Sequence, residues 1–235
     1  MRDLGFCKSE LCRKPLTCDY TKNLEDPISG EYKDNMKHVT IGYQGTPGSN
    51  SEYAAIMLSL KLPSHDTHDR DITYVPLIGS DTVIASLVAG KIDYGVCAIH
   101  NDIGSDVRET CDALDKHADA SIRPIMMTTL VIHHCLYRLL DVSDDDISVI
   151  ASHEQALRQT RRIRHTLYQQ CMELETPDTA LAAAWLADGR LGRDVAVLCP
   201  RRAGERYGLQ LMRANMKDKP SHTTFCMYAA TNEND

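Results

Sequence analysis

Short apolar runs alternate with segments of helical composition over the first half of the chain, and this order constrains the fold more than any other feature. Runs rich in β-branched and aromatic residues, which favour strands, lie at 37–43, 72–77 and 94–99. Segments of helical composition separate them, at 52–58 and 80–88. A strand–helix–strand–helix–strand order predicts a parallel or mixed sheet covered by helices.

The second half of the chain continues the α/β pattern. Further strands are expected at 126–139, 147–150, 195–198 and 225–229. Helices are expected at 152–168, 178–186 and 205–215. This order fits two α/β lobes, with the chain crossing near 118–125 and returning near 200–204. The expected division is a polar N-terminal arm at 1–37, a first lobe at 38–120 plus 203–235, and a second lobe at 121–202.

Composition and charge exclude several classes of protein. The chain has 235 residues and a net charge of -7, which argues against nucleic acid as the main partner because phosphate binding favours a basic face. No run approaches the ~20 apolar residues that a membrane helix needs, and the N-terminus lacks the apolar core of a secretory signal. We therefore expect a cytoplasmic protein with neither a nucleic-acid nor a membrane partner.

The cysteines and one charged loop are the places where a metal could bind. An odd number of cysteines, spread over apolar segments, indicates reduced thiols. Cys7, Cys12 and Cys18 are spaced too widely for the usual zinc-binding pair, so solvated thiols in a loose arm are favoured. The loop at 65–69 contains His and Asp side chains, but a solvated loop is favoured there too. We expect no metal site.

Polar segments follow several of the expected strands. The segment 42–51, GYQGTPGSNS, joins a strand to a helix that Ser51 is placed to cap, and such junctions favour anions. The segment 98–105 follows a buried strand, at the edge where open α/β sheets bind ligands. Ser152 stands in a similar position before a helix, whose basic run at 161–165 indicates a solvated face. Either of the first two segments could instead be a structural turn.

Taken together, these segments resemble the catalytic domain of the prephenate dehydratase family. Segment 42–55 is similar to the family's opening loop and helix, and 93–101, DYGVCAIHN, to its D-Y-G-V-x-P-I-E-N. Residues 134–136 match H-C-L, and 152–157 match S-H-P-Q-A-L. The sequence SHTTF at 221–225 resembles the closing motif, in which Thr-Arg-Phe is usual.

The resemblance extends over about 38–230 and implies two α/β lobes with the active site in a central cleft, as in type II periplasmic binding proteins. The chain departs from the family pattern in both motifs. His100 replaces the Glu of the Glu-Asn pair, and Ala98 replaces the Pro before it. Thr224 replaces the Arg of the closing motif, and Ser221 replaces an Asn. About ten residues follow that motif, so the regulatory ACT domain is expected to be absent.

The resemblance implies a lyase that acts on prephenate, a dianion with an allylic hydroxyl, without a metal or an organic cofactor. Thr223 corresponds to the Thr that hydrogen-bonds the departing hydroxyl. Thr224 cannot hold a carboxylate as Arg would, whereas His100 could supply a cation or a proton. These departures are similar to those of the non-aromatising prephenate decarboxylases of secondary metabolism, including antibiotic biosynthesis, which form a dihydro-4-hydroxyphenylpyruvate.

Non-aromatising decarboxylation is therefore the favoured interpretation. The alternatives are a prephenate dehydratase of phenylalanine biosynthesis, which forms phenylpyruvate, and a non-catalytic protein that binds a small carboxylate. The resemblance also implies a homodimer or homotetramer. The expected catalytic residues are His100, Asn101 and Thr223. The expected substrate-binding residues are Gly45, Thr46, Ser51, Ser152, Gln155, Thr224 and Phe225.

The favoured interpretation gives His100 a direct role, protonation of the ring carbon. It predicts that replacing His100 by Gln abolishes turnover of prephenate. Normal turnover by this variant would rule out that role.

Overall fold

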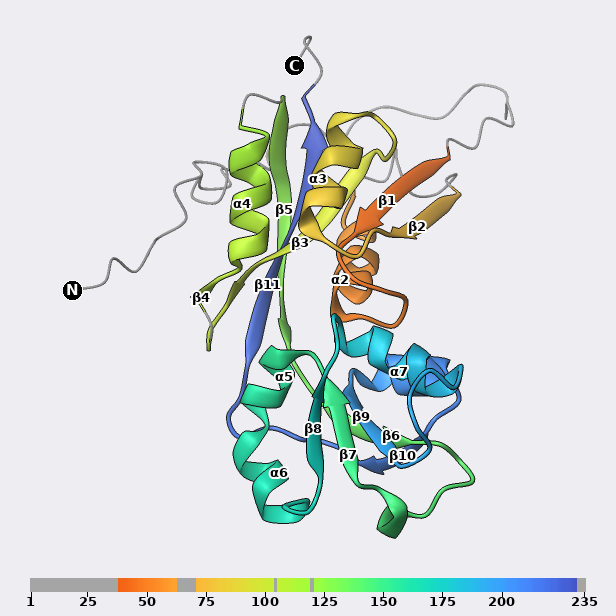
Figure 1. The fold of residues 1–235 in the computed structure, drawn as a ribbon. Coiled ribbons are helices and arrows are strands. Elements are labelled where there is room, and N and C mark those ends of the chain that lie inside the picture. Colours follow the sequence, from red (N-terminus) through yellow and green to blue (C-terminus); the bar gives the residue numbers. More distant parts are fainter. Residues whose placement is uncertain (1–37, 63–70, 104, 119–120, 232–235) are drawn as a thin grey trace, which may run out of the picture.

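The computed structural model describes residues 38–62, 71–103, 105–118 and 121–231. Over these residues the chain forms two lobes, each with a β-sheet and covering helices (Figure 1). The expected two-lobed α/β architecture is therefore confirmed. The arm at 1–37, with its cysteines, and the loop at 65–69 lie outside the described residues.

The first lobe is built on a mixed sheet with the strand order β2-β1-β3-β11-β5, and β4 pairs with β3. β1 is parallel to β2 and β3, whereas β11 is antiparallel to β3 and β5. The strands are β1 (Val39–Tyr43), β2 (Ile72–Pro76), β3 (Tyr94–Asn101), β4 (Ser105–Asp106), β5 (Ile122–Val131) and β11 (His222–Ala230).

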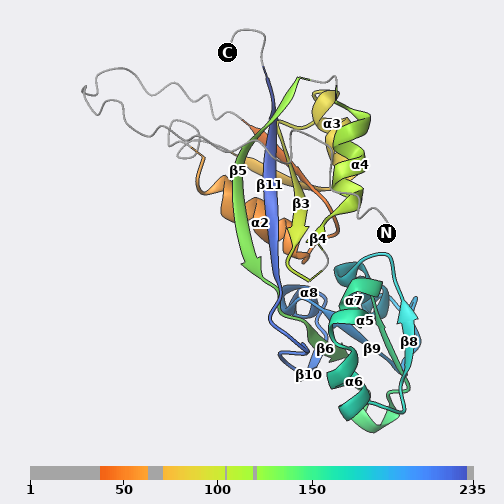
Figure 2. The ribbon, with the colours of Figure 1, turned by 90° about the vertical axis from the view of Figure 1, so that its left-hand side faces the viewer.

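Helices cover both faces of this sheet, with α2 on one side and α3 and α4 on the other (Figure 2). They are α2 (Asn50–Ser59), α3 (Ser80–Val88) and α4 (Arg108–Lys116). Because side chains alternate along a strand, Phe225 and Met227 of β11 join the core beneath α2, while Cys226 and Tyr228 join the core beneath α3 and α4. Both faces of β11 are thus buried along this stretch.

The second lobe is built on a sheet with the order β10-β6-β9-β7-β8. Its strands are β6 (Cys135–Arg138), β7 (Val149–Ser152), β8 (Met172–Glu175), β9 (Val195–Cys199) and β10 (Gln210–Arg213). Its helices are α5 (Glu154–Gln159), α6 (Arg161–Leu167), α7 (Thr179–Ala187) and α8 (Arg201–Arg206), with a short 3-10 turn, η2 (Asp144–Asp146). The inner face of α7 is rich in alanine, whose small side chain lets the helix pack closely on the sheet. These alanines are fully buried.

The chain crosses between the lobes after β5 and again before β11. β5 pairs with β11 in the first sheet, whereas α8 precedes β10 in the second lobe. The expected boundaries at 120 and 203 are therefore corrected, and the crossings lie at 132–134 and 214–221. No local pattern reveals this, because the β5–β11 pairing joins segments far apart in the sequence.

Three expected elements also differ from the structure. The helix expected at 205–215 is the end of α8 followed by β10, because Gly208 adopts a left-handed conformation with φ 66° that ends the helix. The strand expected at 126–139 divides into β5 and β6, and the helix expected at 152–168 divides into α5 and α6. Within the part of the chain described, no helix is both long and apolar enough to cross a membrane.

The lobes touch where α8 meets the loop before α2 and the start of that helix. The guanidinium of Arg202 lies 3.4 Å from the centre of the Tyr53 ring, a cation–π geometry. The Tyr207 hydroxyl donates to the carbonyl oxygen of Pro47 at 3.3 Å. These contacts hold the two sheets together on one side of the space between the lobes.

Gly48 provides a test of this contact. It has a φ of 89°, and an added Cβ would lie 2.7 Å from the Cα of Ala203. Gly90 has a φ of 65° and no neighbour within 4 Å of such a Cβ. Alanine at either position should lower the free energy of unfolding by about 1–2 kcal/mol, because the backbone there is left-handed. Gly48→Ala should lower it by about 1–3 kcal/mol more through overpacking.

Urea unfolding of both variants measures the difference. Equal losses of unfolding free energy in Gly48→Ala and Gly90→Ala would contradict the close approach of the lobes.

Candidate active site

A cavity of about 250 Å³ lies between the two lobes, close to the lower limit of size for small-molecule sites. The first lobe contributes the loop before α2 and the facing ends of β3 and β11, and the second lobe contributes α5 and the start of α7. The polar residues that line it are Gln44, Ser49, Asn50, Ser51, Asn101, Glu109, His134, His153, Gln155, Gln159, Asp178, Thr179 and Thr223.

The start of α2 supplies unpaired donors to this cavity. Ser49 is the N-cap, since its hydroxyl accepts from the N–H of Glu52 at 3.2 Å, and the Glu52 carboxylate accepts from the N–H of Gly48 at 2.7 Å. The expected cap at Ser51 is therefore wrong, because Ser51 lies in the first turn. The N–H groups of Asn50 and Ser51 have no acceptor among the described residues, so a positive helix end faces the cavity.

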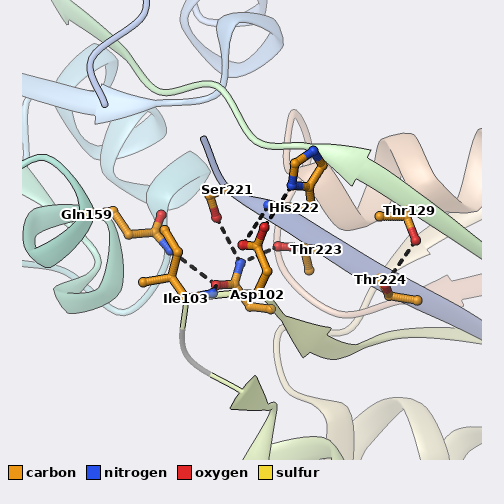
Figure 3. Close-up of polar contacts among 9 residues, drawn as sticks. Asp102, Ile103, Thr129, Gln159, Ser221, His222, Thr223 and Thr224 are labelled. Atoms are coloured by element: carbon orange, nitrogen blue, oxygen red, sulfur yellow. Dashed lines mark hydrogen bonds and ion pairs between the residues drawn. The ribbon is translucent and has the colours of Figure 1, made fainter. Parts of the chain in front are cut away.

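Asn101 and Thr223 form a buried pair at the edge of the cavity. Figure 3 shows Thr223 near Ser221 and Ile103. The N–H of Ile103 donates to Asn101 Oδ1 at 3.0 Å, which fixes the orientation of the amide. Asn101 Nδ2 therefore donates to the Thr223 hydroxyl at 2.7 Å and to the Ser221 hydroxyl at 3.2 Å. Because the Thr223 oxygen accepts, its own hydrogen is available for a ligand.

Gln159 reaches the same pair from the second lobe, and His134 reaches Gln159 from the crossing at 132–134. Gln159 Nε2 lies 3.5 Å from Asn101 Oδ1, and its Oε1 lies 3.1 Å from His134 Nε2. Burial lowers the pKa of His134, so the imidazole is neutral near pH 7. Its Nδ1 is buried and has no partner among the described residues.

The two carboxylates that line the cavity are already occupied by protein donors. Asp178 caps α7 by accepting from the N–H groups of Ala180 and Leu181 at 2.9 and 2.8 Å. It also accepts from the Thr46 hydroxyl at 2.7 Å, which joins the lobes. Glu109 accepts from Gln44 Nε2 at 2.9 Å. Among the described residues, neither Lys nor Arg lines the cavity.

His100 and Thr224 lie on the other face of the sheet. β3 and β11 pair Asn101 with Thr223 and His100 with Thr224, and neighbouring residues of a strand point to opposite faces. His100 is about half exposed and lies 3.1 Å from Asp106, and the Thr224 hydroxyl bonds that of Thr129 at 2.9 Å (Figure 3). The structure thus contradicts a catalytic His100 and a substrate-binding Thr224.

Two other expected binding residues have structural roles. Ser152 is the last residue of β7, and its buried hydroxyl donates to the carbonyl oxygen of Leu198 at 2.6 Å. His153, not Ser152, is the N-cap of α5. Thr46 binds Asp178 and does not line the cavity. The expected residues that do line it are Gly45, Ser51, Asn101, Gln155, Thr223 and Phe225.

The residues that sequence reasoning missed at this cavity are mainly Gln44, Glu109 and Gln159. Gln159 is the last residue of a helix with a polar composition, and nothing in its local sequence distinguishes it from a solvated side chain. His134 belongs to a family motif, but the motif alone predicts no role for it. No group of three or more His, Cys, Asp or Glu side chains suited to a metal ion occurs within the described ranges.

The family model and the relatives found by sequence agree on one family. The family described as "Prephenate dehydratase" matches residues 41–232. Arogenate dehydratase 5 of Arabidopsis thaliana is 30% identical over 190 residues, which are 80% of this chain and 41% of the relative. The bifunctional chorismate mutase/prephenate dehydratase of Neisseria gonorrhoeae is 27% identical over 215 residues, 92% of this chain and 56% of the relative. The chain thus spans about half the length of these relatives or less.

Solved structures show the same fold. The prephenate dehydratase of Arthrobacter aurescens in complex with L-Phe has a TM-score of 0.70 at 22% identity, over 83% of this chain and 61% of that one.

The neutral His134 makes stability depend on pH. Its pKa is lower in the folded chain than the ordinary value of 6.5, so below about pH 6.5 the unfolded chain takes up a proton that the folded chain does not. The free energy of unfolding should then fall by up to about 1.4 kcal/mol per pH unit until the folded pKa is reached. Urea unfolding of wild type and His134→Gln between about pH 7.5 and 5.5 measures this contribution. Identical pH dependence in the two proteins would contradict it.

Proposed function

The chain belongs to the prephenate dehydratase family, and on this premise we propose that it is a lyase that removes carbon dioxide and hydroxide from a prephenate-like substrate. Such a substrate is prephenate itself or arogenate, the amino acid that corresponds to it. Relatives named for each of these two activities match the chain. Aromatisation of the ring drives the loss of carbon dioxide, so no further group is needed to accept the electrons.

The orientation of the Asn101–Thr223 pair carries this proposal. Hydroxide is a poor leaving group, and a donor placed at its oxygen lowers the barrier to departure. Thr223 is such a donor, because Asn101 Nδ2 occupies its oxygen at 2.7 Å and leaves its hydrogen for the ligand. The electrons of the breaking ring–carboxylate bond enter the ring as the hydroxyl leaves, with the Thr223 hydroxyl hydrogen-bonded to it.

The start of α2 supports binding of a carboxylate without a basic side chain. The N–H groups of Asn50 and Ser51 and the hydroxyl of Ser51 belong to the first turn, at the positive end of the helix. In this role they would attract the carboxylate in place of a basic side chain. The site is thus suited to anions but does not hold them by an ion pair.

Non-aromatising decarboxylation is a second candidate. The absence of Lys and Arg from the described cavity lining favours it, since weaker binding of the substrate fits an altered reaction. Its expected acid, His100, lies outside the cavity, so the ring carbon would need another proton donor. A pathway in secondary metabolism and an assembly of two or four chains belong to this proposal and rest on the resemblance alone.

Product analysis separates the candidates. We expect the purified protein to convert prephenate, arogenate or both into an aromatic product, phenylpyruvate or phenylalanine, followed by absorbance and mass spectrometry. A non-aromatic product that keeps the hydroxyl would favour the second candidate. Binding of both compounds without any turnover would contradict a lyase.

Adjacent threonines provide a matched pair of variants for the mechanism. Thr223→Val removes the hydroxyl that faces the cavity and should lower kcat about 10²- to 10³-fold, as loss of a transition-state donor does. Thr224→Val makes the same chemical change on the opposite face and should leave kcat within about twofold of wild type. His100→Gln should behave like Thr224→Val, contrary to the role predicted from sequence. Equal losses in Thr223→Val and Thr224→Val would contradict the assignment.

A further inference from the structure

A line of side chains connects the second lobe to Thr223. His134 Nε2 lies 3.1 Å from Gln159 Oε1, Gln159 Nε2 lies 3.5 Å from Asn101 Oδ1, and Asn101 Nδ2 lies 2.7 Å from the Thr223 hydroxyl. In Figure 3, Gln159 lies at one side of this group and Thr223 at the other. The link at 3.5 Å is the one that crosses between the lobes, and contacts across an unliganded active site often shorten in the complex.

The backbone N–H of Ile103 determines which atom is the donor and which is the acceptor in every hydrogen bond of this line. The backbone N–H of Ile103 can only donate, so the atom of Asn101 that accepts it at 3.0 Å is the oxygen. Gln159 must then present its NH₂ group to that oxygen and its own oxygen to His134. His134 therefore carries its proton on Nε2, which agrees with a neutral ring whose Nδ1 has no partner among the described residues.

Backbone contacts tie Gln159 and His134 to the crossing that leads into β11. The N–H of Asp218 donates to the carbonyl oxygen of Gln159 at 3.0 Å, and the N–H of Met216 donates to that of His134 at 2.8 Å. Both donors lie in the crossing at 214–221, directly before β11. The crossing thus couples the positions of Gln159 and His134 to β11, which pairs with the strand that carries Asn101.

We propose that Gln159 is a positioning residue for the reaction, oriented by His134, and that it acts on Thr223 by holding the Asn101 amide in place when the lobes are together. This inference rests on the proposed function, because Thr223 is the group that meets the substrate. Gln159 donates to the same oxygen as Ile103, so it limits rotation of the amide from the side of the second lobe. The Asn101 amide that orients Thr223 is therefore held from both lobes only while the two lobes meet.

Two substitutions at position 159 separate positioning from simple packing. Gln159→Glu keeps the size and the acceptor for His134, but it turns an oxygen instead of an NH₂ group toward Asn101 Oδ1. Gln159→Leu removes both bonds. We expect kcat to fall roughly ten- to a hundredfold in both variants, with KM changed by less than about threefold. Gln210→Leu, on exposed β10, is the matched control and should leave both constants near wild type.

A merely structural role would tolerate Gln159→Glu, so wild-type kcat in that variant would overturn the proposal. A large increase in KM at unchanged kcat in either variant would overturn it too, because it would make Gln159 a substrate-binding residue.

Nitrogen-15 NMR without any ligand tests the geometry independently of turnover. The proposal predicts a His134 ring protonated on Nε2 and a shift of the Asn101 side-chain NH₂ resonances in Gln159→Leu. Protonation on Nδ1, or unchanged Asn101 resonances, would overturn it. If wild type turns over neither prephenate nor arogenate, the proposed function fails, whereas these resonances still decide whether Gln159 holds Asn101.

Discussion

The antiparallel pairing of β11 between β3 and β5 is the constraint on which the rest of the structure depends. It brings the last strand of the chain into the interior of the first sheet, so the chain must cross twice between the lobes. Its register places Thr223 opposite Asn101 at the edge of the cavity. Because side chains alternate along a strand, a slip of one residue would replace Thr223 by Thr224 at this position.

The same register shows that the two departures from the family motifs are neighbours in the sheet. His100 and Thr224, which stand where the family has Glu and Arg, are direct partners across β3 and β11. Oppositely charged residues at such positions attract each other, so the usual Glu and Arg would face each other on the outer side of the sheet. Here His100 binds Asp106 and Thr224 binds Thr129. Both replacements thus lie outside the cavity, at partnered positions of β3 and β11.

Much of the first lobe follows from the sequence, because its strands and helices carry strong local signals. β1, α2, β2, α3 and β3 lie close to the expected segments. The lobe boundaries do not follow, since the β5–β11 pairing is nonlocal, and neither does the strand β10 beyond Gly208. At the site, the family motifs predict Asn101 and Thr223, but they do not show which face of a strand a residue occupies, and so they also predict His100 and Thr224. Gln159 was missed because only its position across the cleft distinguishes it.

The central claim is that the ligand lies against Thr223, on the side of the sheet that faces the second lobe. A crystal structure of the Thr223→Val variant soaked with prephenate and with arogenate tests it most directly. The account predicts a ligand between the lobes, with its hydroxyl beside the side chain at position 223 and a carboxylate at the start of α2. A ligand bound on the outer face, beside His100 and Thr224, would contradict it.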